Sequence, residues 1–312
     1  MNAARGASAV VFAYHQVGVR CLSVLLARGV DVKLVLTHQD NPNETIWFES
    51  VAALAKVHGI PCITPTDPNA AAILERISAL APDFLFSFYY RQMLGQPLLA
   101  AARRGAYNMH GSLLPKYRGR TPVNWALLYG ERETGASLHR MVAKPDAGAI
   151  VAQQAVPILP DDTAVEVFNK VTVAAEMALH AVLPQLIAGT AIERPQDPLA
   201  ASYFGGRKPE DGRIDWQQGA QRIHDLIRAV APPYPGAFSA LAGKRLGITK
   251  SLLQPRHLTK SSAPGIYCEN GAVYADCADG QVLRLLALEY DGAPLDAAGF
   301  LARFGSEKIL LT

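Results

Sequence analysis

The chain has 312 residues, half of them hydrophobic and 18% charged, a composition typical of a globular protein with one large and one small domain. A net charge of +3 lacks the strong basic excess expected of a protein whose main partner is nucleic acid. The apolar part of the N-terminal stretch is too short for a signal peptide, and no run reaches the roughly 18 apolar residues of a membrane span. A cytoplasmic protein without a membrane span is therefore expected.

Short apolar runs alternate with segments of helical spacing over the first third of the chain. Helices are predicted at 18–29 and 45–58, and two more are predicted to end near Leu80 and Arg104. This alternation is typical of βαβ units, whose parallel strands are buried on both faces. The predicted fold is therefore α/β, with an open, mostly parallel, Rossmann-like sheet. The strands of this sheet are predicted at 8–14, 31–38, 60–65, 84–90 and 105–110.

Two further strands are predicted at 136–142 and 149–159, joined by the turn "AKPDAG". The first strand of the chain is followed by "HQVGVRC", which lacks the GxGxxG pattern, so a dinucleotide site of the usual kind is not expected.

A long helix is predicted at about 163–187. Thr163 and Glu166 fit a capping box at its start, Gly189 is a natural stop, and Pro184 is expected to bend or weaken the last turn. Its buried stripe is predicted to consist of apolar residues spaced by threes and fours, which are Phe168, Val171, Ala175, Leu179, Val182 and Leu186.

The second part of the chain has a different texture. Residues 189–216 are polar and rich in turn formers, and they are interpreted as a linker that precedes a helix at 220–230. From Ala237 onward short strands alternate with turns, which predicts a small, β-rich, barrel-like domain resembling an OB fold. The expected domains are a main domain at 1–200 and a small one at 201–312.

Cysteine and histidine spacing predicts no metal site. Cys21, Cys62, Cys268 and Cys277 are too widely spaced for a zinc site or a compact disulfide framework, so free thiols are expected. The histidines outside the strand at 105–110 also lack ligand spacing. They are His15, His38, His58, His139, His180, His224 and His257.

Asn108 and His110 form a candidate pair for acyl-group chemistry. Side chains alternate along a strand, so both would lie on one face, at the carboxyl end where α/β sheets bind ligands. An amide can donate a hydrogen bond to a developing oxyanion, and an imidazole can move a proton. The same N-x-H pattern also occurs at strand ends whose polar side chains are hydrogen-bonded and have no catalytic role.

Asp146, in the turn "KPDAG", is the candidate third member. A carboxylate beside a histidine fixes its tautomer, whereas an aspartate in such a turn can equally cap it. The spacing along the chain leaves both readings open. Ser112 in "HGS" lacks the G-x-S-x-G elbow of a nucleophilic serine.

Two other stretches suggest ligand contacts. Lys116, Arg118 and Arg120 could hold a phosphate or a carboxylate-bearing cofactor, or could form a solvated basic loop. "SFYYRQML" ends a strand with two tyrosines and an arginine, which could line a pocket for a flat ring or lie at its rim.

These stretches together resemble the folate-dependent formyltransferase family. The resemblance rests on "NMHGSLLPKYRG", "DAGAIVAQ" and "RAVAPPYPGAF", and it covers most of the chain. Within the family, "VVFAYHQVG", "THQDNP", "FSFYYR" and "TGASLHRMVAKPDAGAIVAQ" are most similar to the domain that formylates UDP-4-amino-4-deoxy-L-arabinose in the bifunctional polymyxin-resistance enzyme of lipid A modification. Methionyl-tRNA formyltransferases usually have a G-T-P turn in place of "AYHQVG".

The resemblance implies formyl transfer from 10-formyltetrahydrofolate to the 4-amino group of the sugar nucleotide. Asn108 would stabilise the tetrahedral oxyanion, His110 would protonate the departing folate nitrogen, and Asp146 would orient His110 and favour its protonated form. The implied folate contacts, many through the backbone, are Gln92, Met93, Leu94, Arg120, Val142, Ala143, Lys144, Pro145 and Asp146.

Several alternatives stay open from the sequence. The acceptor could be a different amino-sugar nucleotide or a charged initiator tRNA, and a silent folate- or nucleotide-binding module is a third possibility. The expected partners are small molecules, the sugar nucleotide and the folate. No decarboxylase segment like that of the bifunctional enzyme follows residue 312, so a stand-alone formyltransferase or a piece lacking that segment is expected.

Overall fold

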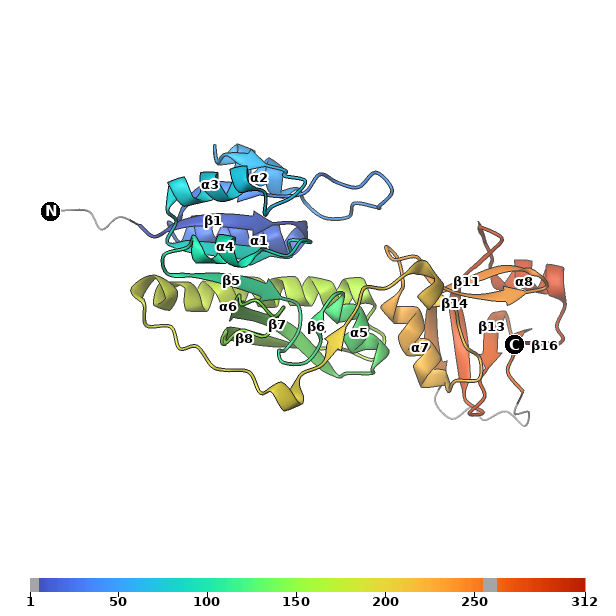
Figure 1. Ribbon diagram of the computed structural model, residues 1–312. Coiled ribbons are helices and arrows are strands. Elements are labelled where there is room, and N and C mark those ends of the chain that lie inside the picture. Colours follow the sequence, from blue (N-terminus) through green and yellow to red (C-terminus); the bar gives the residue numbers. More distant parts are fainter. Residues whose placement is uncertain (1–5, 255–262, 312) are drawn as a thin grey trace. The chain divides into compact units, whose positions relative to one another are not determined.

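The computed structural model describes residues 6–254 and 263–311, which fall into two compact units (Figure 1). The first five residues, part of the stretch judged too short for a signal peptide, lie outside this description. The first unit consists of Met1–Pro122, Glu133–Pro157 and Phe168–Gly205, and the second of Val123–Arg132, Ile158–Val167 and Gly206–Thr312.

The first unit is built on a seven-stranded sheet of order β3-β2-β1-β4-β5-β7-β8. The five strands from β3 to β5 are parallel, and β7 and β8 extend the sheet in antiparallel fashion. The prediction of an open, mostly parallel α/β sheet is thus confirmed. The strands are β1 (Ser8–Ala13), β2 (Asp31–Leu36), β3 (Cys62–Ile63), β4 (Phe84–Phe88), β5 (Gly105–His110), β7 (Glu133–Arg140) and β8 (Ile150–Pro157).

Helices cover both faces of this sheet. Val10 and Phe12 point to the face covered by α3 (Ala71–Leu80) and α4 (Gln96–Ala100), where they share an apolar core with Ile77 and Leu98. The next residue along β1, Ala13, points to the other face, against Gly18 of α1 (His15–Ala27).

The second predicted helix is shorter than expected. Helix α2 spans Val51–Val57, because the Ser50 side chain caps its start by accepting a hydrogen bond from the Ala53 N–H at 3.2 Å. The residues before Ser50 form a loop instead. This loop is held by Glu44, which makes a two-pronged ion pair with Arg91 at 2.9 and 2.8 Å. The helix predicted to end near Arg104 likewise ends early, at Ala100.

Helix α6 (Ala164–Ala188) has segments in both units. The whole predicted apolar stripe is buried, Glu166 accepts hydrogen bonds from the Thr163 N–H and hydroxyl, and Gly189 ends the helix with a φ of 73°. The helix continues past Pro184 to Ala188. Among the described residues it is the one helix long and apolar enough to cross a membrane, and half of that stretch is buried, as in a core helix of a folded domain.

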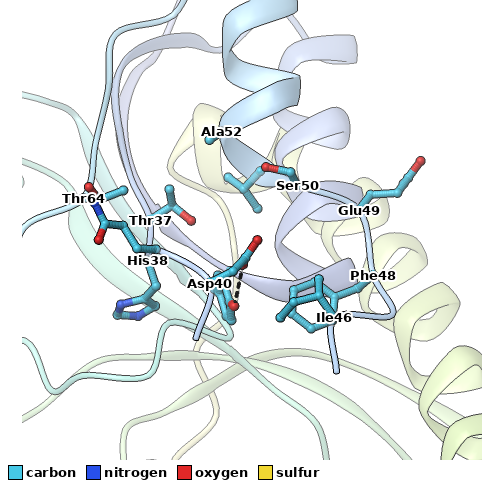
Figure 2. Close-up of a pocket in the computed structure, with 12 residues that line it drawn as sticks. Thr37, His38, Asp40, Ile46, Phe48, Glu49, Ser50, Ala52 and Thr64 are labelled. Carbon is cyan, nitrogen blue, oxygen red and sulfur yellow. Dashed lines mark hydrogen bonds between the residues drawn. The ribbon is translucent and has the colours of Figure 1, made fainter. Parts of the chain in front are cut away.

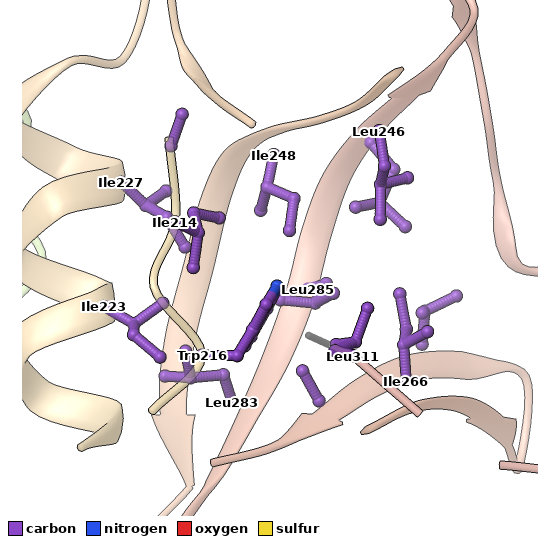
Figure 3. Packing of buried hydrophobic residues seen from close by; sticks show 14 of the residues in the cluster. Ile214, Trp216, Ile223, Ile227, Leu246, Ile248, Ile266, Leu283, Leu285 and Leu311 are labelled. Carbon is purple, nitrogen blue, oxygen red and sulfur yellow. The ribbon is translucent and has the colours of Figure 1, made fainter. Parts of the chain in front are cut away.

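The second unit is a curled antiparallel sheet that forms half a barrel. Trp216 is fully buried in its core and donates its indole N–H to the Ser239 hydroxyl at 2.9 Å (Figure 3). The strands follow the order β10-β11-β14-β13-β12-β16, with β15 beside β14. They are β10 (Ala237–Leu241), β11 (Lys244–Gln254), β12 (Gly265–Glu269), β13 (Ala272–Asp276), β14 (Val282–Tyr290), β15 (Ala293–Pro294) and β16 (Ile309–Leu310).

Helices α7 (Ala220–Ala229) and α8 (Ala297–Phe304) contact this sheet, and most of α5 (Pro122–Leu128) also belongs to the second unit. The stretch interpreted as a linker contains secondary structure and core residues. It includes a short strand, β9 (Tyr203–Phe204), which pairs in parallel with β6 (Arg118–Gly119) in the first unit, and it supplies Ile214 and Trp216 to the core of the second.

Candidate active site

Strand β5 delivers Asn108 and His110 to the carboxyl edge of the first unit's sheet. The strand lies between β4, which is parallel to it, and β7, where Asn108 faces His139 and His110 faces Ser137. His110 is buried, with 6% of the residue exposed, whereas Asn108 is partly exposed.

The structure brings Asp146 to this pair. One carboxylate oxygen, Oδ1, lies 3.6 Å from His110 Nδ1 and 3.4 Å from Asn108 Nδ2. The other, Oδ2, accepts a hydrogen bond from the Gly119 N–H at 2.9 Å. These contacts lie outside the "PDAG" turn, so the side chain of Asp146 faces the strand residues and does not serve as a simple turn cap.

His139 completes the group, although its sequence context did not mark it as a site residue. Its Nε2 lies 3.3 Å from Asp146 Oδ1 and 3.1 Å from Asn108 Nδ2, and its Nδ1 lies 2.9 Å from the Arg140 carbonyl. Because a carbonyl only accepts, Nδ1 donates to it, which leaves Nε2 facing both the Asn108 amide and the Asp146 carboxylate. The one feature of the sequence that could have indicated His139 is its position inside a strand predicted to be buried, which pairs with β5 in the structure.

The orientation of His110 is set by a backbone group. Its Nε2 lies 2.7 Å from the carbonyl oxygen of Tyr117, so the Nε2–H donates to that oxygen. The nitrogen that remains free to exchange a proton is therefore Nδ1, on the side of Asp146. This is a feature of the fold that residue spacing could not reveal.

Asp146 is held as a carboxylate. Burial by itself raises its pKa, but the facing imidazoles of His110 and His139 and the Gly119 N–H outweigh burial and hold the pKa well below its usual range. Its backbone is in the left-handed region, with a φ of 53°, which is costly for a residue other than glycine. A fixed negative charge thus faces two histidines.

Apart from Arg120, the residues expected to contact folate lie in two loops, one after β4 and one after β7. Met93 is exposed, whereas the Leu94 side chain is 8% exposed and packs into the core beside Leu98, so only its backbone could meet a ligand. The Gln92 amide donates to the Thr66 carbonyl at 2.9 Å. In the second loop, the residues from 142 to 145 are exposed, as is Arg120.

The expected basic loop does not face solvent as a unit. Lys116 and Arg120 are exposed, but Arg118 is 3% exposed and its guanidinium bonds to Gln196 and Tyr203. Arg118 cannot join the other two in holding a solvent-borne anion. Neither possibility left open by the sequence, an anion-holding loop or a solvated basic loop, therefore describes Arg118, which is buried.

A cavity of about 260 Å³ opens at the same edge, beyond the ends of β1 and β2 (Figure 2). Hydroxyl groups, two carboxylates and three aromatic rings line it, and the lining includes Tyr14, Thr37, His38, Asp40, Phe48, Glu49 and Ser50. No lysine or arginine lines it, so it suits an uncharged, hydroxyl-bearing group better than a phosphate.

Beside this cavity His15 is packed among aromatic rings. Phe48 lies 3.8 Å from it between ring centroids, and Phe168 lies 4.6 Å away. Its Nδ1 is buried without a hydrogen-bond partner among the described residues, and burial, with the charge of Arg91, lowers the pKa of His15 to about 3. His15 is therefore a neutral imidazole at neutral pH.

The pair of tyrosines after β4 is engaged within the protein. Tyr90 stacks on His38, with ring centroids 4.0 Å apart, and Arg91 lies over the Tyr14 ring. The described residues contain no cluster of three or more histidine, cysteine or acidic side chains that could hold a metal ion, and all four cysteines are unpaired.

Three solved structures with a similar fold are named as formyltransferases. An N-formyltransferase from Helicobacter canadensis, in complex with folinic acid and dTDP-3-aminofucose, is 20% identical over 90% of this chain and 98% of its own, with a TM-score of 0.73. WlaRD, a sugar 3N-formyl transferase solved with dTDP and 5-N-formyl-THF, is 19% identical over 89% and 97%, with a TM-score of 0.71. A methionyl-tRNA formyltransferase from Clostridium thermocellum is 15% identical over 91% and 98%, with a TM-score of 0.56.

Family matches extend over most of the sequence. Residues 20–183 match the family described as formyl transferase, and residues 207–305 match the family described as formyl transferase, C-terminal domain. The first of these regions holds Asn108, His110, His139 and Asp146. The chain therefore belongs to the formyl transferase family.

Proposed function

We propose that this enzyme transfers a formyl group from 10-formyltetrahydrofolate to the 4-amino group of UDP-4-amino-4-deoxy-L-arabinose. The convergence of Asn108, His110 and Asp146 at one edge of the sheet is the observation that carries formyl transfer. Two solved structures with this fold support a folate donor and a sugar-nucleotide acceptor, since one is in complex with folinic acid and dTDP-3-aminofucose and the other was solved with 5-N-formyl-THF and dTDP. The specific sugar rests on the sequence resemblance.

In the proposed reaction the amine nitrogen attacks the formyl carbon, and the oxygen becomes an oxyanion. The Asn108 amide donates to that oxygen, which is the kind of contact that lowers such barriers most. The bond from carbon to the folate nitrogen then breaks, and His110 Nδ1 gives that nitrogen a proton as it leaves. The attacking amine loses a proton, and the products are the N-formyl sugar nucleotide and tetrahydrofolate.

Asp146 supports this chemistry through charge and orientation. A carboxylate 3.6 Å from His110 Nδ1 stabilises the protonated ring that the last step requires. His139 keeps the amide of Asn108 turned so that its NH₂ group points into the same space. We place the folate ring against the backbone of Gln92–Leu94 and Val142–Asp146, with Arg120 near its charged tail.

The cavity beyond β1 and β2 is our candidate for an uncharged part of the acceptor. We assign the chemistry to residues 1–200 and regard residues 201–312 as a small β-rich domain that accompanies it. We further propose that the enzyme works in the cytoplasm, where both small-molecule substrates would be available.

A comparison of acceptors tests this function. Purified enzyme with 10-formyltetrahydrofolate should release tetrahydrofolate fastest with UDP-4-amino-4-deoxy-L-arabinose, more slowly with dTDP-3-aminofucose, and not with charged initiator tRNA. Preferred turnover of the dTDP sugar would correct the acceptor. Turnover of the tRNA alone would favour methionyl-tRNA formyltransferase activity, since an enzyme with that activity has a similar fold.

A further inference from the structure

Arg118 is a buried cation with an unusual set of partners. Its guanidinium Nε and Nη2 donate to Gln196 Oε1 at 3.1 and 2.6 Å, and Nη1 donates to the Tyr203 hydroxyl at 3.3 Å. The guanidinium also lies over the Tyr203 ring, 5.3 Å from its centroid. None of these partners is a carboxylate. Burying a charge against neutral groups costs free energy, so the arrangement calls for a function.

Both partners of Arg118, Gln196 and Tyr203, also donate hydrogen bonds to the turn that carries Asp146. The Gln196 amide donates to the carbonyl oxygens of Asp146 and Gly148, at 2.8 and 2.7 Å. The Tyr203 hydroxyl donates to the carbonyl of Pro145 at 2.9 Å. Three carbonyls of this turn are therefore held by two side chains that meet at one guanidinium.

The charge of Arg118 decides which way the Gln196 amide faces. A glutamine amide has similar shape after a half-turn, so its oxygen and nitrogen can exchange places. Arg118 only donates hydrogen bonds, so it keeps the oxygen of Gln196 on its own side and the NH₂ group on the side of Asp146. Without Arg118, the amide could turn and release both carbonyls.

The backbone around Arg118 holds the reacting side chains from the other direction. The Tyr117 carbonyl accepts from His110 Nε2, and the Gly119 N–H donates to Asp146 Oδ2. This segment is kept in place by pairing with β9, since the Arg118 N–H donates to the Ser202 carbonyl at 2.9 Å. The backbone of residues 117–119 thus contacts His110 and Asp146, and the Arg118 side chain is linked to the turn of Asp146 through Gln196 and Tyr203.

We propose that Arg118 is a positioning residue for formyl transfer, acting through Gln196 and Tyr203 to hold Asp146 in its left-handed conformation facing His110. A residue other than glycine keeps such a conformation only when its surroundings over-determine it. The inference rests on the proposed function for its kinetic consequence, but its structural consequence can be measured without any substrate.

The test compares Arg118→Met, Arg118→Lys and Gln196→Ala with the wild-type enzyme. Arg103→Met is the matched control, because Arg103 is an exposed arginine of the same unit that pairs with Asp83. Arg118→Met should lower kcat about 10- to 100-fold, with KM values for both substrates within about twofold, because misplacing a catalytic group costs rate more than binding. Arg118→Lys should recover part of the rate, and Arg103→Met should match the wild type.

Amide hydrogen exchange of the substrate-free protein supplies the second readout. The Gly119 N–H should exchange about tenfold faster in Arg118→Met and Gln196→Ala, because its acceptor on Asp146 is no longer held. Wild-type kcat or unchanged Gly119 exchange in folded Arg118→Met would overturn the proposal. If that variant does not fold, the same result in Gln196→Ala overturns it. A wild-type enzyme that formylates no amino sugar would refute the proposed function but leave the exchange result to decide this inference.

Discussion

His139 Nε2 lies 3.1 Å from Asn108 Nδ2, across the antiparallel pair of β5 and β7. The other ring nitrogen of His139 donates to the Arg140 carbonyl, so the ring is held with Nε2 beside the Asn108 amide and the Asp146 carboxylate. The NH₂ group of Asn108 is therefore fixed toward His139 and Asp146, and its carbonyl is turned away. A hydrogen-bond donor to an oxyanion must be oriented before the reaction, and His139 helps to orient the Asn108 amide.

His139→Ala should lower kcat about 100-fold, because the Asn108 amide would lose its fixed orientation. His139→Gln, which can present a carbonyl oxygen to the same amide, should retain more of the rate. Steady-state kinetics at saturating folate checks this prediction. His58→Ala, at an exposed histidine, is the control and should behave as wild type. Equal rates for His139→Ala and the control would contradict the assigned role.

His110→Ala and Asn108→Ala should remove turnover while leaving the fold and folate binding in place. Loss of an acid–base group costs about 10²- to 10⁴-fold in rate, and loss of one oxyanion donor costs about 10²- to 10³-fold. Neither side chain belongs to the apolar core, so circular dichroism should match the wild type. Titration with 5-formyltetrahydrofolate measures binding. A folded variant with full turnover would remove the corresponding residue from the mechanism.

Asp146→Asn should change how stability responds to acid. The folded-state pKa of Asp146 lies below the unfolded value of roughly 3.9, so the unfolded chain takes up the proton first as pH falls. The carboxylate's contribution to stability is thus present above about pH 4 and is lost below it. The variant should be less stable at pH 7, and the difference should narrow on acidification.

Urea unfolding between pH 7 and pH 3 measures this difference in the free energy of unfolding. Glu75→Gln, at an exposed carboxylate of α3, is the control and should leave the pH dependence unchanged. A constant gap between Asp146→Asn and wild type over the whole range would show that the carboxylate is not specially stabilised.

His15→Phe should make the protein less sensitive to mild acid. The unfolded chain protonates this histidine below about pH 6.5, whereas burial keeps the folded-state pKa at about 3. Folding is therefore penalised increasingly as pH falls from 6.5 toward 3, by up to about 1.4 kcal/mol per pH unit. Phenylalanine removes this titration and the unpartnered Nδ1 while keeping a ring beside Phe48.

The slope of unfolding free energy against pH between 6.5 and 4 tests the effect. The slope should be smaller in His15→Phe than in the wild type, while His58→Phe should leave it unchanged. An identical slope in His15→Phe would mean that the imidazole protonates freely in the folded state.

Much of the fold could be predicted from local pattern. Strand β5 was expected at 105–110 and is observed at Gly105–His110, because its apolar run ends in polar residues that only a sheet edge tolerates. Helix α6 was expected within one residue of its observed ends, because its apolar stripe and its stop at Gly189 are properties of a single segment. The helix expected from residue 45 begins only at Val51, after the Ser50 cap, and the loop before it is held by the ion pair of Glu44 with the distant Arg91.

The sequence by itself determined the chemistry available: an amide and an imidazole two residues apart on one strand, and an aspartate in a turn with a family pattern around it. Only the tertiary structure decided how these groups are used. It brought His139 opposite Asn108, directed His110 Nδ1 toward Asp146, and buried Arg118 behind the catalytic turn. The physical reason is that hydrogen-bond direction and burial depend on strand pairing between distant segments, which local residue patterns do not encode.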